Sequence, residues 1–253
     1  MPCVYSCMNP ARHPRIHHER IDSTNARARL LAAAGAEEGT VVTASFQTQG
    51  RGRLDRSWVA PPGVNLLVSV IQYPARPMED WGGIPLLAGL AASDAIAAVA
   101  PLEPVLKWPN DVLVQNRKIA GILVEAGQAA SRPWCVIGTG INVNQREFEG
   151  SYRCEPTSML LEAGRIHDVE AVLDAFLSSL DRWNAVWRVN GTSAIVAAWR
   201  MRSDMIGSAR DLEDHTGIRR VTVVDVCDDG SLLVRHGDDS EARVYAGDVS
   251  TAR

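Results

Sequence analysis

The sequence predicts an α+β fold, in which helices flank a mixed, largely antiparallel sheet and a small β-barrel follows. Runs of strand length between residues 105 and 143 alternate with tight turns, a pattern typical of consecutive hairpins and unlike a Rossmann domain. Apolar residues recur at steps of three and four from Val169 to Trp187, as on one face of a long amphipathic helix. After Gly207 the chain changes to short β-runs separated by Asp-Asp-Gly and Gly-Asp-Asp turns, which predicts the barrel.

The first hundred residues alternate helical and strand patterns. Several N-cap residues precede the first alanine-rich run, and Gly35 follows it as a helix stop. Two apolar, β-branched runs come next, and the polar loop between them is long enough to be functional. The expected elements are a helix that begins at Ser23 or Thr24, strands at 40–47 and 65–73, and a buried helix at 84–99.

The second half follows the hairpin and helix patterns described above. Expected strands are 105–108, 112–115, 119–125 and 134–143, followed by helices from Asp168 to 187 and at 193–201, and by β-runs at 219–227, 231–236 and 242–246. These elements divide the chain into three parts. Residues 1–18 are expected to be disordered, 19–205 to form the main domain and 206–253 the small C-terminal domain.

The composition is that of an ordinary soluble protein. The 253 residues are 46% hydrophobic and 22% charged, enough to bury a substantial core. No apolar run approaches the ~20 residues that a membrane helix needs, so no membrane association is expected. A formal net charge of -4 provides no global basic field, so nucleic acid is not an expected partner and any anion site must be built locally.

The five cysteines indicate a reducing compartment. They include no Cys-x-x-Cys pair, which suits free thiols in the cytoplasm better than a disulfide framework. Cys3 and Cys7 lie near histidines, but no partner pair follows at zinc-site spacing, so no protein ligands for a metal are expected. The first 18 residues also lack the apolar core of a secretory signal. The expected location is therefore the cytoplasm.

The loop from residue 47 to residue 58 has the strongest chemical signature. Its three arginines lie within six residues, separated by glycines whose backbone can wrap closely around an anion. Arginine forks suit phosphate and carboxylate oxygens. A solvated basic loop is the alternative, but a glutamine before the cluster and a tryptophan after it favour a binding site. The residues are Gln47, Gly50, Arg51, Gly52, Arg53, Arg56 and Trp58.

Two short blocks add candidate catalytic groups. Lys107-Trp108-Pro109-Asn110-Asp111 places a cation beside two polar groups at a strand end, although a simple turn explains the block as well. Lys118 follows a tight turn, and a hairpin there would return it near Asp111. A lysine so placed can neutralise charge that builds on a carboxylate oxygen and an α-phosphate, whereas the alternative is a surface lysine.

Glycines and asparagines complete the list of candidates. Gly121 would let a ligand lie against bare backbone. The block Gly138-x-Gly140-Ile141-Asn142-x-Asn144 lacks the third glycine of a dinucleotide fingerprint, but its asparagines could bind an adenine edge. Walker, zincin and nucleophile-elbow motifs do not occur in the sequence.

In order and spacing these blocks resemble the biotin-protein ligases. The matching residues are Ser23-Thr24-Asn25, Gly50-Arg51-Gly52-Arg53-x-x-Arg56-x-Trp58, Lys107 to Asp111, Lys118 to Glu125, and Gly138 to Asn144. The resemblance runs from about Ile21 to the C-terminus, and it implies a class II synthetase-like catalytic domain followed by an SH3-like domain. Many bacterial relatives begin with a DNA-binding domain, for which the residues before Ser23 are too few, so repressor activity is not expected.

The resemblance also implies a two-step reaction. Biotin and ATP, with Mg²⁺, would form biotinyl-5′-AMP, which the lysine of a biotin carrier domain of a carboxylase would then attack. By motif position, biotin would contact Ser23, Thr24, Asn25, Gln47, Gly50, Arg51, Gly52, Arg53, Lys118 and Gly121. ATP or the adenylate would contact Arg53, Arg56, Trp58, Asn110, Lys118 and Asn142. Lys118, Arg53 and Asp111 are the expected catalytic residues, with Asp111 orienting or deprotonating the incoming amine.

Three other functions compete with this interpretation. A lipoate-protein ligase would use the same chemistry on a different acyl chain, but the Arg-Gly loop and the Lys107 to Asp111 block favour biotin. A noncatalytic biotin sensor would not need Lys118 together with three loop arginines. An RNA-binding module is disfavoured by the acidic balance and by the few aromatics of the C-terminal strands. The resemblance further allows a homodimer through a sheet edge that the sequence does not identify.

Overall fold

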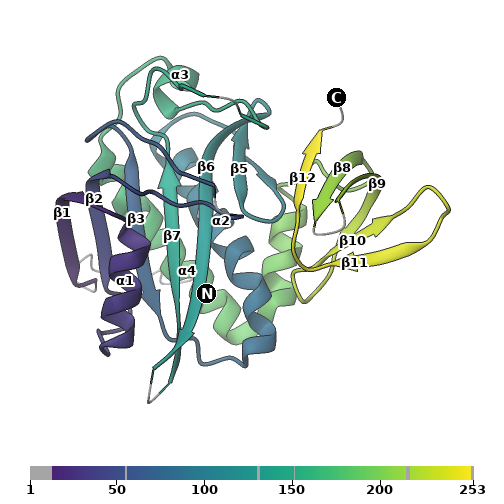
Figure 1. Cartoon of the computed structure of the whole chain (residues 1–253), viewed down its shortest axis with the longest axis horizontal. Coiled ribbons are helices and arrows are strands. Elements are labelled where there is room, and N and C mark those ends of the chain that lie inside the picture. Colours follow the sequence, from purple (N-terminus) through teal and green to yellow (C-terminus); the bar gives the residue numbers. More distant parts are fainter. Residues whose placement is uncertain (1–12, 55, 130–131, 151, 215–216, 252–253) are drawn as a thin grey trace, which may run out of the picture.

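Two sheets organise the computed structural model, which describes residues 13–54, 56–129, 132–150, 152–214 and 217–251. The large sheet has seven strands in the order β1-β2-β3-β7-β6-β5-β4, and the small sheet has five in the order β11-β10-β9-β8-β12 (Figure 1). Among the described strands only β1 and β2 pair in parallel, so the large sheet is mixed and mainly antiparallel. The predicted fold class is confirmed.

The central strands of the large sheet form consecutive hairpins, as expected. Gln115 and Asn116 turn β5 into β6 with φ angles of 49° and 62°, the geometry of a type I′ turn. This turn pairs Leu113 with Lys118 and so brings Lys118 back toward Asp111. The strands are β1 (Arg15–Ile21), β2 (Val41–Gln47), β3 (Leu66–Gln72), β4 (Val105–Lys107), β5 (Asp111–Val114), β6 (Arg117–Gln128) and β7 (Pro133–Ile141).

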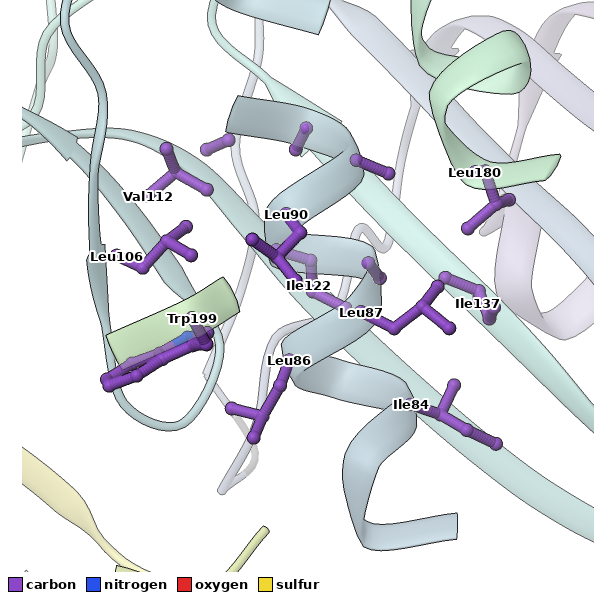
Figure 2. Close-up of a cluster of buried hydrophobic side chains, with 14 of the residues drawn as sticks. Ile84, Leu86, Leu87, Leu90, Leu106, Val112, Ile122, Ile137, Leu180 and Trp199 are labelled. Carbon is purple, nitrogen blue, oxygen red and sulfur yellow. The ribbon is translucent and has the colours of Figure 1, made fainter. Parts of the chain in front are cut away.

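Helices cover both faces of the large sheet. On one face lies α1, where Ala28 and Ala32 pack against Val42, Ile71 and Val136, and on the other lie α2 and α4 (Figure 1). Figure 2 shows leucines of α2 between the sheet residues Ile122 and Ile137 and the α4 residues Leu180 and Trp199. The helices are α1 (Thr24–Ala33), η2 (Met78–Gly83, a 3-10 helix), α2 (Ile84–Val99), α3 (Met159–Ala163) and α4 (Val169–Arg200).

The small sheet packs against the main domain through specific polar contacts. Trp108 Nε1 donates to the Gly230 carbonyl oxygen at 3.0 Å, and Arg200 forms a two-pronged contact with Asp225 at 2.7 and 2.8 Å. These contacts fix the sheet beside the β4–β5 turn and the end of α4. Its strands are β8 (Ala209–Asp214), β9 (Gly217–Val226), β10 (Leu232–Arg235), β11 (Glu241–Val244) and β12 (Asp248–Thr251).

The N-terminal segment differs from its prediction. Residues 15–18, expected to be disordered, belong to β1, because their backbone pairs with β2 from Arg15 opposite Val41 onward. Residues 1–12, including the candidate metal ligands Cys3 and Cys7, lie outside the described residues. The histidine-rich edge strand is half exposed and lacks a run of buried apolar residues, so its residue pattern does not indicate a strand.

Several other elements were absent from the prediction. These are α3 and the small-sheet strands β8 and β12, which are short or polar; Leu212 is the only fully buried side chain of β8. The two helices predicted from Asp168 to residue 201 form one element in α4, divided at Gly191, where φ is 76°. That kink lies between the two predicted helices.

One described segment is long and apolar enough to cross a membrane, contrary to the expectation that no apolar run approaches this length. Met78–Val99 spans 22 residues with a mean hydropathy of 1.6 over its most apolar window, 67% of which is buried. It comprises η2 and α2, and α2 packs between the large sheet and α4. A helix that is apolar on all sides is expected in the core of a large domain, and that is its place here.

Candidate functional site

A cavity of about 560 Å³ opens on the sheet face that carries α1. Its walls come from the start of α1, residues 51–54 and 56–59 of the arginine loop, strands β6 and β7, residues between 148 and 150 and between 152 and 156, and the first residue of β12. The predicted site residues that line it are Ser23, Thr24, Asn25, Gln47, Arg51, Gly52, Arg53, Arg56, Trp58, Asn110, Asp111, Lys118, Gly121 and Asn142. The structure therefore brings together every predicted site residue except Gly50.

One end of the cavity is a hydrogen-bonded cluster of hydroxyl and amide groups. Gln47 Oε1 accepts from the Thr24 backbone N–H at 2.7 Å and from Thr24 Oγ1 at 3.0 Å, and the hydrogen bonds of the Gln47 side chain among the described residues all use this oxygen and not Nε2. Asn25 donates to the Leu123 carbonyl oxygen and to Glu125, and its Oδ1 accepts from Ser69 at 2.6 Å. The Gln47 amide is thus available to a ligand, whereas the Asn25 side chain is used by the protein.

The arginine loop is closed on itself by backbone hydrogen bonds. Gly52 N–H donates to the Arg56 carbonyl oxygen at 2.7 Å, and Trp58 N–H donates to that of Gly50 at 2.9 Å. A Cβ on Gly50 would lie 2.2 Å from the Trp58 carbonyl oxygen, so this position tolerates only glycine. Gly50, predicted to contact biotin, therefore closes the loop and does not line the cavity.

Trp58 forms part of the cavity floor. A Cβ on Gly140 would lie 2.5 Å from its ring, and one on Gly121 would lie 2.9 Å from it. Lys118 Nζ is 5.7 Å from the ring centroid, within the range of a cation–π contact. Gly121 lines the cavity, with Trp58 and Lys118 beside the place that a Cβ would occupy, and its contact with a ligand stays a prediction.

Asp111 lies between two lysines. Its Oδ1 is 2.5 Å from Lys118 Nζ, and its Oδ2 accepts from Lys107 Nζ at 3.1 Å. Burial alone would raise the pKa of Asp111, but Lys118 and Lys107 outweigh it and hold this pKa at about 2. Burial acts to lower the pKa of Lys107, and here Asp111 and Asp248 outweigh it, so the pKa is raised. Asp111 is thus ionised and both lysines have a counter-ion.

The geometry shows a role for Asp111 that was not predicted. Its contacts with Lys107 and Lys118 orient two lysines of the protein itself. A general base works best when its pKa is near the working pH, and the lowered pKa of Asp111 disfavours proton transfer to it. The predicted roles of Asp111, which were to orient or to deprotonate the incoming amine, stay predictions.

The C-terminal sheet reaches into the cavity at its cationic end. Arg56 Nη1 is 2.5 Å from Asp248 Oδ2, and Lys107 Nζ is 3.7 Å from Asp248 Oδ1. Arg53 donates to the Gly247 carbonyl oxygen and to Asn110 Oδ1, each at 3.2 Å. Two of the predicted phosphate-binding arginines are thus held by the start of β12.

The two predicted nucleotide-binding asparagines are already engaged within the protein. Asn110 donates to the Ile122 carbonyl oxygen at 2.7 Å while its Oδ1 accepts from Arg53. Asn142 donates to the Thr157 carbonyl oxygen at 2.9 Å, and only 4% of it is exposed. Their side chains brace the cavity wall, and a direct adenine contact by either amide stays a prediction.

No metal centre accompanies these groups in the part of the chain that the structure describes. His, Cys, Asp and Glu side chains do not gather there in threes in a way that could hold an ion.

Sequence reasoning assigned no role to three charged residues that contact the predicted site residues: Lys107, Asp248 and Glu125. The sequence does contain a signal for Lys107, because lysine occurs only at positions 107 and 118 and every other Lys or Arg position is arginine. Asp248 and Glu125 had no such local signal. They join the site through contacts with arginines far away in the sequence.

The chain is similar to known proteins over nearly its whole length. The family model described as "Biotin/lipoate A/B protein ligase family" matches residues 18–142. A biotin--[acetyl-CoA-carboxylase] ligase of Mycobacterium tuberculosis is 38% identical over 237 residues, which are 90% of this chain and 85% of that protein. A ligase with the same name from Paracoccus denitrificans is 32% identical, with 85% of this chain and 92% of that one covered.

The fold has close counterparts among solved structures. The biotin protein ligase from Aquifex aeolicus, in complex with biotin and ATP, superimposes with a TM-score of 0.81 and 26% identity. The match covers 95% of this chain and 99% of that one, so it includes both sheets.

Proposed function

Because the chain belongs to the biotin-protein ligases of the biotin/lipoate A/B protein ligase family, we propose that its cavity forms biotinyl-5′-AMP and passes the biotinyl group to a carrier lysine. The chain is an ATP-dependent biotin-[acetyl-CoA-carboxylase] ligase. Biotin and ATP are its substrates. The residue roles below are the proposal, and they rest on the geometry of the cavity.

The observation that carries this assignment is the polarity of the cavity. Its amide and hydroxyl end, around Gln47 and Thr24, suits an uncharged polar ring. Its other end carries Arg53, Arg56 and Lys118, which suit phosphate oxygens. A carboxylate bound between the two ends would lie beside the α-phosphate of ATP.

In the first step a carboxylate oxygen of biotin attacks the α-phosphorus of ATP. The bond from that phosphorus to the bridging oxygen breaks, and pyrophosphate leaves with the electron pair. Lys118 stabilises the charge on the α-phosphate oxygens, and Asp111 keeps this lysine oriented. Mg²⁺ would accompany ATP and would offset the negative charge of its phosphates.

In the second step the neutral amine of a carrier lysine attacks the biotinyl carbonyl carbon. The carbonyl–oxygen bond to AMP breaks, AMP leaves, and the amine proton passes to solvent. The loop 50–58 retains the adenylate until the amine arrives, since its arginines face the cavity and its backbone is closed. The proposed acceptor is the biotin carrier domain of a biotin-dependent carboxylase.

Biotin-dependent exchange of labelled pyrophosphate into ATP tests this function. With Mg²⁺ the protein is expected to exchange in the presence of biotin and not of lipoate. Lys118→Gln is expected to lower the exchange rate by about 10²- to 10³-fold, as when a transition-state hydrogen-bond donor is removed. Arg235→Gln, which removes only an exposed contact of β10 with Glu241, serves as the matched control.

The outcomes separate the competing functions. Exchange with lipoate alone would make the chain a lipoate-protein ligase. Binding of biotin without exchange would make it a noncatalytic sensor. Exchange with biotin but no transfer to a purified biotin carrier domain would leave the first step intact and contradict the proposed acceptor.

A further inference from the structure

Arg51 does not stand free in the cavity. Its Nη2 donates to Glu125 Oε2 at 2.9 Å, and this carboxylate lies on β6, 74 residues further along the chain. The same carboxylate accepts from Arg29 and Asn25, each at 2.9 Å, and both of these residues belong to α1. Glu125 therefore joins the first turn of the arginine loop to α1 and to the sheet.

The exposed fractions of Glu125, Arg51 and Arg29 show which of these side chains is held in place by the protein. The Glu125 side chain is 20% exposed, whereas Arg51 and Arg29 are 39% and 45% exposed. A mostly buried carboxylate needs its partners, and Asn25 fixes one of its oxygens, because the Asn25 side chain is buried and hydrogen-bonded on every side. Glu125 is thus the fixed member, and Arg51 is the member that it holds.

Glu125 accepts from only one of the three guanidinium nitrogens of Arg51, so other N–H donors of Arg51 remain for a second acceptor. Arginine presents five N–H donors in a rigid fork, so Nε and Nη1 of Arg51 remain for an anion in the cavity. Arg29 offsets the negative charge of Glu125, so the net charge of the three groups stays positive. A substrate carboxylate would meet a preoriented cation.

We infer that Glu125 is a positioning residue for the first half-reaction, which holds Arg51 ready for the carboxylate of the acyl substrate. This inference rests on the proposed function and deepens it. Glu125 itself touches no substrate in this scheme. Glu125 affects the substrate by orienting Arg51, and Asn25 of α1 in turn holds Glu125 in place.

Glu125→Gln tests the inference, because it keeps the shape of the side chain and removes its charge. In biotin-dependent pyrophosphate exchange the KM for biotin is expected to rise about tenfold, since a charge-assisted hydrogen bond is roughly twice as strong as a neutral one. The KM for ATP is expected to change by less than about twofold, because Arg53 and Arg56 contact Asn110, Gly247 and Asp248 and not Glu125. Glu125→Asp keeps the charge and is expected to restore part of the lost biotin affinity.

A double-mutant cycle separates positioning from a merely structural role. If Glu125 acts through Arg51, the double variant Arg51→Gln with Glu125→Gln is expected to bind biotin no worse than Arg51→Gln alone. Arg29→Gln, which removes the other and more exposed guanidinium on the same carboxylate, is the matched control, with an expected change below about threefold.

Additive effects in the cycle would overturn the inference, and so would an equal rise of both KM values. Thermal unfolding of each variant shows whether a loss arises from misfolding instead. If the unchanged protein shows no biotin-dependent exchange, the proposed function fails. If it exchanges and Glu125→Gln matches it in biotin KM, only the role of Glu125 fails.

Discussion

Asp111 shows how one residue organises the reactive end of the cavity. It is the shared counter-ion of Lys107 and Lys118, the only lysines in the sequence. Removing one partner of a buried ion pair leaves the other charge without compensation, which is costly. Asp111 therefore ties the stability of the domain to the placement of Lys118, the proposed catalytic lysine.

The pKa of Asp111 predicts an acid-dependent loss of stability. Because this pKa is about 2 in the folded protein and 3.8 in its ordinary state, ionised Asp111 contributes on the order of 2 kcal/mol above pH 3.8. That contribution is lost as the pH falls from 3.8 through about 2. Denaturant unfolding at pH 5, 4 and 3 is expected to show a steeper decline for the unchanged protein than for Asp111→Asn. Asp211→Asn, on the small sheet, is the control, and parallel declines for the unchanged protein and Asp111→Asn would contradict this account.

Strand β1 shows how an element without a strong sequence pattern is held in place. It lies at the edge of the large sheet, in parallel with β2, and its side chains are half exposed. Just before it, His13 hydrogen-bonds to Asp181 of α4 at 3.0 Å and to the Gly39 carbonyl oxygen at 2.9 Å. The hydrogen bonds of His13 thus connect the start of β1 to α4, which covers the sheet face opposite to α1.

This connection is expected to weaken at alkaline pH. The hydrogen bond to Asp181 raises the pKa of His13 above 6.5, so protonated His13 contributes stability below pH 6.5 that is lost as the pH rises through the raised value. The contribution is expected to be up to about 1 kcal/mol. Denaturant unfolding at pH 6 and pH 9 should show this loss in the unchanged protein and a smaller one in His13→Gln. His17→Gln, on the exposed part of β1, is the control. An equal loss in His13→Gln would show that another group titrates.

At the scale of the whole molecule, the C-terminal sheet is part of the site. Gly247 and Asp248 hold Arg53, Arg56 and Lys107, so the cationic end of the cavity is complete only when β12 is in place. Burial acts to raise the pKa of Asp248, but Lys107 and Arg56 outweigh it and the pKa is lowered. The sheet therefore contributes a fixed negative charge that orients Arg56 and Lys107, and a carbonyl oxygen that holds Arg53.

Asp248→Asn is expected to weaken ATP use more than biotin use. Loss of this partly buried counter-ion should misplace Arg56 and Lys107 and raise the KM for ATP about 5- to 30-fold, equivalent to about 1–2 kcal/mol. Pyrophosphate exchange at varied ATP concentration measures the effect. Glu241→Gln, in the same sheet but paired only with Arg235, is the control. An unchanged KM for ATP would mean that β12 supports the fold without serving the nucleotide.

The elements with strong local patterns were predictable from the sequence. Helix α2 has the predicted bounds of 84–99, Ser23 caps α1 as its sequence indicated, and the type I′ turn before β6 confirms the hairpin there. N-caps, helical periodicity and tight turns depend on residues that are neighbours along the chain. The polar strands β1, β8 and β12 escaped prediction because their partners, and not their own side chains, make them strands.

By itself the sequence determined the family motifs, the fold class and a set of site residues of which all but Gly50 line the cavity. Only the tertiary structure decided which contacts each of those residues makes. It placed Gly50 in the turn of its loop, Trp58 over Gly121, and Asp111 between two lysines. The ion pair of Arg56 with Asp248 joins residues 192 positions apart. Such contacts depend on how whole elements pack, because a charge is stabilised by whatever the fold brings next to it and not by its neighbours in the chain.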